Sequence, residues 1–581
     1  MLREIRLRPV PRRSRLEELV LLGVVAGAVA ARLFAGVAGA ARAAGVGAGG
    51  ERSVVDAVVG AAAVAVVLAF AVLDVQALRA RRGGRERTPS SGRTPRVHSG
   101  LSRPGGTRPR AAGASSSWAR AGDLGPLRVG AARGGRLTLG FGPGGLLAAE
   151  ARQSVIVIGP TQSRKTTGLA IPAILEWEGP VLATSVKADL AAATLTWRAG
   201  LPGAVTWCFD PTGATGLPRA TWSPLDAATT WGGARRVAHA LCAAARTTGT
   251  GMTDAEFWYT TAAKLLAPLL FAASRSGRTM ADVVSWVDTQ ETDGVLALLE
   301  SLGVAEACDA AIASWSREER TRSSVYTTAE TVLDAFASLA ALDSPAPEGL
   351  CPRIDVPRLV DGGPHTLYVC APLHEQRRYR PLLSALVSEV LAAGMATAAA
   401  AGGSLPAPLL VVLDEAANIA PVEDLDALAA TAAGQGIQLL TVWQDLAQIL
   451  ARYGERGATV VNNHRAKVIL SGISDPRTLE QVSGLLGDSE VPVRSVTTGP
   501  DGRRSSTAST SMRRLASADA LRRLRPGEGV LVYGHLPPAR LRLRPYFADR
   551  ALRRRAPPAR APTVASRRAD PQPGGWPRPG G

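Results

Sequence analysis

The pattern of hydrophobic and polar positions predicts three kinds of segment in this chain. Two apolar stretches, at residues 19–41 and 54–73, each approach the roughly 20 residues that a helix needs to cross a bilayer. Short aliphatic or β-branched runs predict buried strands, at residues 154–158, 181–185, 408–415, 438–443 and 466–471. Apolar residues spaced three to four apart predict helices over about residues 224–345. The pattern therefore predicts a membrane anchor joined to an α/β domain that carries a helical insertion.

Arginines flank the two apolar stretches and predict their topology. Six arginines precede the first stretch, ten follow the second, and the connecting loop is about a dozen residues long. By the positive-inside rule, residues 1–78 form a two-helix transmembrane hairpin in the cell membrane, with the rest of the chain in the cytoplasm. Arg32 interrupts the first span, at a cost of about 2.5 to 3.5 kcal/mol if it lies centrally. A cleaved signal peptide is the competing interpretation, but the second span and the cytoplasmic site described below favour an anchor.

The formal net charge of +18 is concentrated at the two ends of the chain. Residues 1–120 hold 20 arginines against 7 acids, residues 549–581 hold 8 against 2, and residues 121–548 have a net charge of −1. Arg, Pro, Ser and Gly dominate residues 79–120 and the tail at 549–581, which predicts a disordered basic linker and a disordered tail. The linker arginines either contact anionic lipid headgroups or only set the topology. The bulk charge therefore does not by itself indicate nucleic-acid binding.

Composition argues against several classes of protein. The cysteines are far apart and lack CxxC spacing, and the six histidines show no HExxH pattern. These spacings exclude a disulfide scaffold and a zinc ribbon and disfavour a metalloenzyme. The length of 581 residues allows three or four structural units. Only four of the 67 basic residues are lysines, so the position of each one is informative: Lys165, Lys187, Lys264 and Lys467.

One of these lysines lies in a pattern typical of a phosphate-binding loop. The segment QSVIVIGPTQSRKTTGLAIPAIL begins at Gln153 as a strand, turns, and continues as an apolar helix. The loop amides and the helix N-terminus would hold the phosphates of ATP, Lys165 would reach the β- and γ-oxygens, and the Thr166 hydroxyl would bind Mg²⁺. The candidate nucleotide-binding residues are Gly159, Pro160, Thr161, Gln162, Ser163, Arg164, Lys165, Thr166 and Thr167. A strand, turn and helix without a nucleotide is the alternative.

Arg164 departs from the usual form of this loop. The GxxxxGK[ST] pattern has glycine immediately before the lysine, and this chain has Arg164 there. Glycine at that position allows an unusual backbone angle or a close approach to phosphate, so a side chain costs about 1 to 2 kcal/mol or reshapes the loop. The Arg164 side chain could instead add a phosphate contact.

A second segment carries the acidic residues that such a site needs. The run PLLVVLDE is an apolar strand that ends at Asp414 and Glu415. In a doubly wound parallel sheet, the carboxyl end of such a strand faces the nucleotide crevice. Asp414 would hold Mg²⁺ through water, and Glu415 would orient or deprotonate the attacking water. Gln444 follows a further strand and would sense the γ-phosphate or relay hydrolysis, or else it is a helix-capping or surface amide.

The distance between these two motifs predicts an insertion. Lys165 and Asp414 are 249 residues apart, more than a compact parallel sheet requires. We expect an α/β nucleotide-binding domain at residues 121–223 and 346–548, interrupted by an all-α domain at residues 224–345. The aromatic residues of the insertion fit core packing better than stacking on nucleic-acid bases: Phe257, Trp258, Tyr259, Trp286 and Trp315.

Together these segments resemble the TraG/TraD type IV secretion coupling proteins, which are membrane-anchored hexameric ATPases of conjugation systems. The resemblance rests on GPTQSRKT, VLATSVKADL, VVLDEAANIAP, GQGIQLLTVWQDLAQI, NNHRAKVILSGISDPRTLEQVSGLLGD and PGEGVLVYGHLPPARLRLRPYF, and covers most of residues 1–75 and 137–548. It implies a RecA-like P-loop NTPase ring below the membrane. It also implies delivery of single-stranded DNA with its attached relaxase, or of protein, to the components of a secretion channel. Residues 405–540 would match the part linked to recognition of accessory proteins.

The resemblance also leaves roles and alternatives open. Hydrolysis at a subunit interface would need a positive group from the neighbouring protomer, for which Arg465, Arg477 and Arg380 are candidates. One alternative is an FtsK/HerA-like DNA pump, a class without the inserted helical domain. Another is a nucleotide-binding membrane scaffold without robust hydrolysis, which Arg164 would favour.

Overall fold

The computed structural model describes residues 115–132, 134–213, 215–246, 252–336, 352–372, 374–419, 421–498, 502 and 504–556. All of them belong to one compact unit that runs from residue 110 to residue 581. The two predicted membrane spans, at residues 19–41 and 54–73, lie outside the described residues. The transmembrane hairpin therefore stays a prediction.

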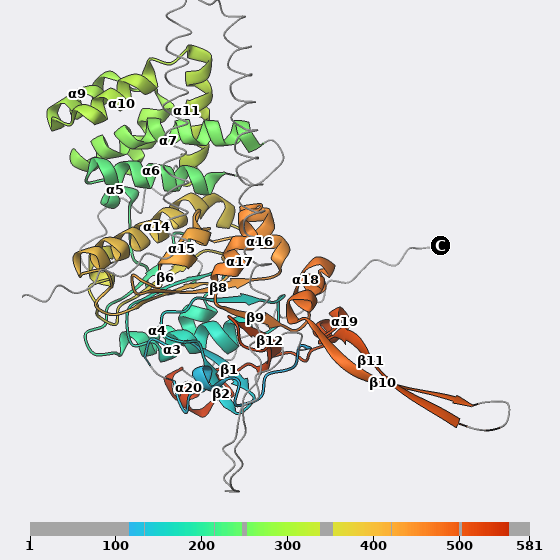
Figure 1. Ribbon diagram of the computed structural model, residues 1–581. Helices are drawn as coiled ribbons and strands as arrows, with labels where there is room; N and C mark the ends of the chain where they lie inside the picture. The colour runs from blue at the N-terminus through green and yellow to red at the C-terminus, as the bar shows by residue number, and fades with distance from the viewer. Residues whose placement is uncertain are drawn as a thin grey trace, which may run out of the picture. The chain divides into compact units, whose positions relative to one another are not determined.

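A large mixed sheet forms the centre of the described part of the chain (Figure 1). Its eleven strands follow the order β2-β1-β13-β12-β9-β3-β8-β7-β4-β6-β5. The strands from β9 to β5 pair in parallel: β9 (Ala466–Leu470), β3 (Val155–Ile158), β8 (Ile437–Trp443), β7 (Leu409–Leu413), β4 (Val181–Ser185), β6 (Thr366–Cys370) and β5 (Thr206–Phe209). Five of them confirm the strands predicted from aliphatic runs.

The other edge of this sheet is antiparallel, so the predicted parallel sheet is confirmed for β9 to β5 and does not extend to this edge. This edge consists of β12 (Glu528–Tyr533), β13 (Ala539–Arg542), β1 (Thr138–Gly142) and β2 (Gly145–Ala148). Strand β13 alternates buried and exposed positions, with arginines at the exposed ones. One side of such a strand faces solvent, which an antiparallel edge permits and a sheet covered on both faces does not.

Alternate residues of the parallel strands pack into two separate hydrophobic cores. In β3, Val155 and Val157 belong to one core, while Ile156 and Ile158 belong to the other. The first core is covered by η2 (Thr166–Ala170), α3 (Ile171–Glu176), α4 (Asp189–Ala199) and α20 (Arg550–Arg555). The second is covered by α14 (Gln376–Ala400), α15 (Leu425–Thr431), α16 (Leu446–Tyr453), α17 (Arg456–Asn463) and α18 (Pro476–Leu486). Helices on both faces of a parallel sheet make the three layers of a doubly wound domain.

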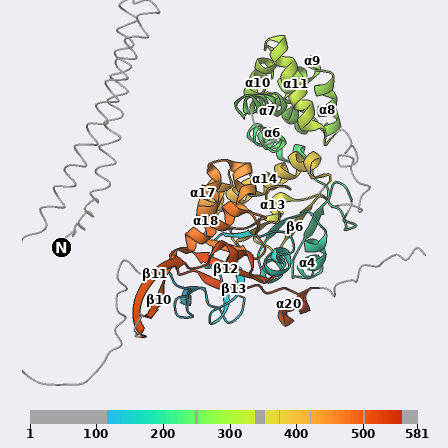
Figure 2. The same cartoon turned by 90° about the vertical axis from the view of Figure 1, so that its right-hand side faces the viewer.

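The region predicted as an insertion contains helices, here called the helical subdomain (Figures 1 and 2). They are α5 (Pro224–Ala227), α6 (Trp231–Ala245), α7 (Met252–Arg275), α8 (Met280–Asp288), α9 (Asp293–Leu302), α10 (Ala305–Trp315) and α11 (Glu319–Leu333). Helix α6 contacts α14, which joins the subdomain to the second core. Four of its aromatic residues pack against that core as expected: Trp258, Tyr259, Trp286 and Trp315. The expectation is wrong for Phe257, which is 51% exposed.

Among the described residues, one helix is long and apolar enough to cross a bilayer. This helix is α14, and 56% of its apolar window is buried inside the protein. It covers the sheet and contacts α6. Burial against protein on two sides is what a core helix requires, so the length and composition of α14 reflect packing.

The ends of the ordered domain differ from the predicted boundaries. The predicted disordered linker ends too late, because Ser116 and Ala119 donate backbone hydrogen bonds to Asp488 and Pro538. The predicted disordered tail begins too early, because α20 forms at Arg550–Arg555 with Asp549 as its N-cap. In both segments, contacts with distant parts of the chain order a stretch whose own composition is polar.

A separate hairpin was not expected from the sequence. Strands β10 (Asp488–Thr498) and β11 (Arg504–Arg514) pair antiparallel over eleven residues and form a two-stranded sheet of their own. Figures 1 and 2 show this hairpin extending away from the large sheet. The remaining short elements are η1 (Gly125–Leu127), α13 (Val356–Leu359) and α19 (Ala518–Arg522).

Candidate functional site

The loop between β3 and η2 has the backbone shape of a phosphate-binding loop. Gly159 lies where a Cβ atom would be 2.8 Å from Ser163 Oγ and 2.9 Å from Leu470 Cβ, so only glycine fits there. Gln162 and Arg164 both have left-handed backbone angles, with φ of 66° and 68°. Such angles in consecutive turns direct backbone N–H groups to one side, which is how a nest for an anion forms.

Arg164 therefore adopts the conformation for which this loop usually employs glycine. A side chain in the left-handed region costs about 1 kcal/mol or more, so the loop keeps its shape at the expense of local strain. The aliphatic part of Arg164 packs beside Gly527, where an added Cβ would lie 3.3 Å from Arg164 Cδ. The chain just before β12 thus holds this side chain, and the loop is preserved rather than reshaped.

Lys165 lies within the loop and is 7% exposed. Its ammonium group donates hydrogen bonds to the carbonyl oxygens of Gly159 at 3.0 Å and Pro160 at 3.1 Å. Burial lowers the pKa of this ammonium group, while the carboxylates of Asp414 and Glu415 act in the opposite direction. A cation held in this way lies where phosphate oxygens enter the loop.

Thr166 and Asp414 connect the loop to the end of β7. The Thr166 hydroxyl donates a hydrogen bond of 2.9 Å to Asp414 Oδ2. The other carboxylate oxygen, Asp414 Oδ1, is buried and has no hydrogen-bond partner. Burial raises the pKa of Asp414 to about 6, and the hydrogen bond from Thr166 only partly offsets this. A buried carboxylate with an unsatisfied oxygen next to a hydroxyl is a ready site for a hard cation.

Glu415 has a left-handed backbone, with φ of 57°. Its side-chain oxygen Oε2 accepts a hydrogen bond of 3.1 Å from Asn418 Nδ2. Arg380 on α14 donates to the Asn418 carbonyl oxygen at 3.3 Å. The strained turn after β7 thus directs Asp414 and Glu415 to the same cavity, and Asn418 fixes the orientation of the Glu415 carboxylate.

These residues surround one cavity of about 510 Å³. The loop contributes Thr161, Gln162, Arg164, Lys165, Thr166 and Thr167, and the end of β7 contributes Asp414 and Glu415. The end of β4 and the residues that follow it form a further wall: Ser185, Val186, Lys187 and Asp189. Two of the four lysines of the chain therefore lie at this cavity, although the sequence singled out only Lys165 as a phosphate ligand.

The last wall comes from a residue that sequence reasoning missed. Phe547 lines the cavity from the segment that follows β13. The available signal was its place at the end of PGEGVLVYGHLPPARLRLRPYF, the last segment that carries the resemblance. Nothing in that segment marks Phe547 as a site residue, so only the fold reveals its place at the cavity.

The other predicted site residues lie outside the cavity that Lys165 and Asp414 line. Gln444 follows β8 and its backbone N–H donates to Gln448 Oε1 at 3.0 Å, but it does not line the cavity. It does not cap α16 either, because that cap is Asp445. Arg465 lies 3.3 Å from Glu150 Oε2 and over the Tyr533 ring. Arg477 is exposed at the start of α18.

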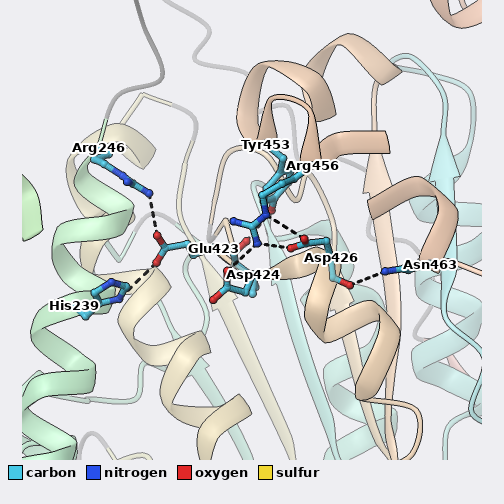
Figure 3. A network of polar contacts seen from close by, with 9 residues as sticks. His239, Arg246, Glu423, Asp424, Asp426, Tyr453, Arg456 and Asn463 are labelled. Carbon is cyan, nitrogen blue, oxygen red and sulfur yellow. Dashed lines mark hydrogen bonds and ion pairs between the residues drawn. The ribbon is translucent and has the colours of Figure 1, made fainter. Parts of the chain in front are cut away.

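A polar network joins the segment after Glu415 to the helical subdomain (Figure 3). Glu423 accepts from Arg246 at 2.9 Å and lies 3.5 Å from His239 Nδ1. His239 is on α6, and Arg246 is the residue that caps its C-terminal end. On the other side, Arg456 of α17 forms ion pairs with Asp424 and Asp426. The chain that leaves the cavity is thus held by ionic contacts to two different helices.

Comparison with known proteins places these features in a family. The model of the family described as type IV secretory system conjugative DNA transfer matches residues 115–569. A conjugal transfer protein TraG of Escherichia coli is 26% identical in an alignment of 383 positions that covers 61% of this chain and 57% of that protein. A second Escherichia coli protein of that description is 35% identical over 74 residues, or 11% of its length. The chain thus spans less than two thirds of either curated relative.

Solved structures show a similar fold. The bacterial conjugative coupling protein TrwBdeltaN70, in an unbound form, has a TM-score of 0.56 at 18% identity, covering 73% of this chain and 92% of that one. TrwB bound to the ATP analogue ADPNP has a TM-score of 0.54, with the same identity and coverage. TrwB with ADP and Mg²⁺ has a TM-score of 0.55 at 18% identity, covering 74% of this chain and 94% of that one. The predicted RecA-like P-loop fold is thereby confirmed.

Proposed function

Because this chain belongs to the type IV secretory system conjugative DNA transfer family, we propose that it is a membrane-anchored coupling ATPase. It would use ATP hydrolysis to deliver single-stranded DNA with its relaxase, or protein, to a secretion channel. The observation that carries the proposal is the hydrogen bond between Thr166 and Asp414 beside Lys165. It unites the two halves of an ATPase site from distant parts of the chain.

The residues at the cavity fit a nucleoside triphosphate with Mg²⁺. The Thr166 hydroxyl and the unsatisfied Asp414 Oδ1 are oxygen donors of the kind that Mg²⁺ prefers. When bound, Mg²⁺ would neutralise charge on the phosphates. The backbone N–H groups around Gln162 and Arg164 would hold the phosphates, with Lys165 exchanging its loop carbonyls for phosphate oxygens. The relative TrwB was solved with ADPNP and with ADP and Mg²⁺, which supports this assignment.

Glu415 would orient the attacking water and accept its proton. A general base must be held within hydrogen-bond reach of the water, and the Asn418 side chain restrains the Glu415 carboxylate for this task. Lys165 would keep its positive charge close to the phosphates as the transferred group gains negative charge. Gln444 directly follows β8, the strand that lies between β3 and β7 in the sheet. It would respond to the γ-phosphate by a movement of the turn in which it lies.

We further propose that the protein acts as a hexamer at the cell membrane, anchored by residues 1–78. In a ring, the positive side chain that completes a neighbour's site must not be tied up by contacts within its own protomer, because it has to reach across the subunit interface. Arg380 is bonded to Asn418 beside Glu415, and Arg465 is paired with Glu150. The exposed Arg477 is therefore the best candidate of the three.

An ATPase assay on the full-length protein, with and without single-stranded DNA, tests the proposal. Lys165→Ala and Glu415→Gln should abolish turnover, while Lys264→Ala, which changes an exposed lysine on α7, should not. Unchanged hydrolysis in both site variants would overturn the proposal. Stimulation by duplex DNA alone would favour the FtsK/HerA-like alternative, and nucleotide binding without turnover in the unmodified protein would favour a scaffold.

A further inference from the structure

The segment after β13, residues 543–556, crosses the helix that follows the phosphate-binding loop. We call it the C-terminal strap. The Tyr546 N–H donates a hydrogen bond of 3.0 Å to the Thr167 carbonyl oxygen, and the Leu543 N–H donates one of 2.7 Å to Gly527. Leu543 also packs so close to Gly168 that an added Cβ there would lie 3.0 Å from it. The strap therefore lies against residues next to Thr166.

Ionic contacts hold the strap in place. Arg544 is 8% exposed and forms ion pairs of 2.6 Å with Glu176 on α3 and with Asp549 at the start of α20. Arg555 donates to the Leu175 carbonyl oxygen at 2.8 Å. A buried arginine with two carboxylate partners is costly to displace, because either partner left alone would be an unpaired charge. The position of Phe547, between Arg544 and Asp549, is thus well defined.

Phe547 is a large apolar side chain that remains 48% exposed at the cavity. Among the described residues that line the cavity, it is the one aromatic residue, and the others are mostly polar or charged. Its ring meets the Tyr546 ring edge to face, with centroids 5.5 Å apart. Edge-to-face packing occupies the margin of one ring and leaves flat surface available for another planar group.

We propose that Phe547 stacks on the base of the nucleotide whose phosphates the loop holds. This inference rests on the proposed function, and it assigns the base-binding subsite to the C-terminal strap. The phosphate end of the cavity is fixed by Lys165 and Asp414, and the strap passes Thr167 on its way to Phe547. Because every nucleobase has a flat π-face, a phenyl ring accepts adenine and guanine alike. The site should therefore bind purine nucleotides with little preference between them.

Binding measurements on the full-length protein test this assignment. We expect Phe547→Ala to weaken binding of ADPNP and GDPNP by the same factor, about tenfold. Inorganic tripolyphosphate, which has no base, should bind the variant and the unmodified protein equally. Phe547→Trp should restore nucleotide affinity, whereas Phe547→Leu, which is apolar but not planar, should not. Phe257→Ala changes an equally exposed phenylalanine on α7 and is the matched control.

Three outcomes would overturn the inference. The first is unchanged nucleotide binding in Phe547→Ala. The second is an equal loss of tripolyphosphate binding in that variant, which would mean that the ring only supports the loop. The third is full recovery of nucleotide affinity in Phe547→Leu. A different result would contradict the proposed function. Lys165→Ala should weaken both nucleotide and tripolyphosphate binding, and if it weakens neither, the phosphate site itself is wrong.

Discussion

The Thr166 hydroxyl donates a hydrogen bond of 2.9 Å to Asp414 Oδ2 across 248 residues of sequence. The helical subdomain lies between them in the chain, yet the two side chains meet because β3 and β7 both flank β8. In a parallel sheet, residues that follow neighbouring strands gather at the same edge. The bond is therefore a direct consequence of strand order.

The negative charge on Asp414 should lower the free energy of unfolding, although Mg²⁺ binding requires that charge. Its pKa is raised to about 6, so the folded protein binds this proton more tightly than the unfolded chain does. The ionised carboxylate therefore destabilises the fold above pH 6, by about 1 to 3 kcal/mol. We expect Asp414→Asn to raise the melting temperature at pH 7 and to abolish Mg²⁺-dependent turnover. Calorimetry should show this gain shrinking as the pH falls from 6 toward 4, while Asp309→Asn on α10 changes little.

Affinity for Mg²⁺ should also depend on this proton. Only the ionised form of Asp414 can bind the cation, so Mg²⁺-dependent nucleotide binding should fall as the pH drops through about 6. The charged groups that act on Asp414 include Lys165, which lowers its pKa, and Glu415 and Asp189, which raise it. Titration calorimetry at pH 5 to 8 measures the dependence. An affinity that is flat between pH 5 and 7 would contradict the assignment of Asp414 as the ligand.

The strain at Arg164 can be measured separately from its charge. Its φ of 68° suits glycine, so Arg164→Gly should stabilise the protein relative to Arg164→Ala by about 1 kcal/mol. Both variants remove the guanidinium group, so the difference between them reports only the backbone. Thermal unfolding of the two proteins gives the comparison. Equal stabilities would mean that the loop relaxes when the arginine is removed.

A buried histidine should make the fold sensitive to acid. His464 is fully buried, with its ring nitrogens near the Val460 carbonyl oxygen and the Thr441 hydroxyl. Burial lowers its pKa to about 4 from a usual 6.5. As the pH falls, the histidine is protonated in the unfolded chain before it is protonated in the folded protein. The free energy of unfolding therefore decreases between pH 6.5 and 4, by about 1.4 kcal/mol per pH unit. His464→Asn should remove this slope in urea unfolding, whereas His535→Gln, which changes an exposed histidine, should leave it unchanged.

Sequence patterns predict the parts of this fold that are buried on both sides. Strands such as Val181–Ser185 consist of apolar or β-branched residues, and the motif at Lys165 includes its own strand, turn and helix. Strand β13 was missed because its exposed positions are arginines, and β11 was missed because it is rich in serine and threonine. Those segments become strands through pairing with partners that no local pattern specifies. Phe547 was missed because its place at the cavity depends on contacts of the strap with Thr167 and Gly527, which no local pattern specifies either.

The location of Phe547 on the strap has a consequence for protein synthesis. The residues that line the nucleotide cavity run from Thr161 to Phe547, so the last of them follows the first by 386 residues of sequence. Helices α6 to α11 pack mainly against one another, so the helical subdomain can fold while the chain is still being made. The cavity cannot be complete until Phe547 has left the ribosome. A nascent chain that stalls earlier thus carries its phosphate-binding loop without the aromatic wall.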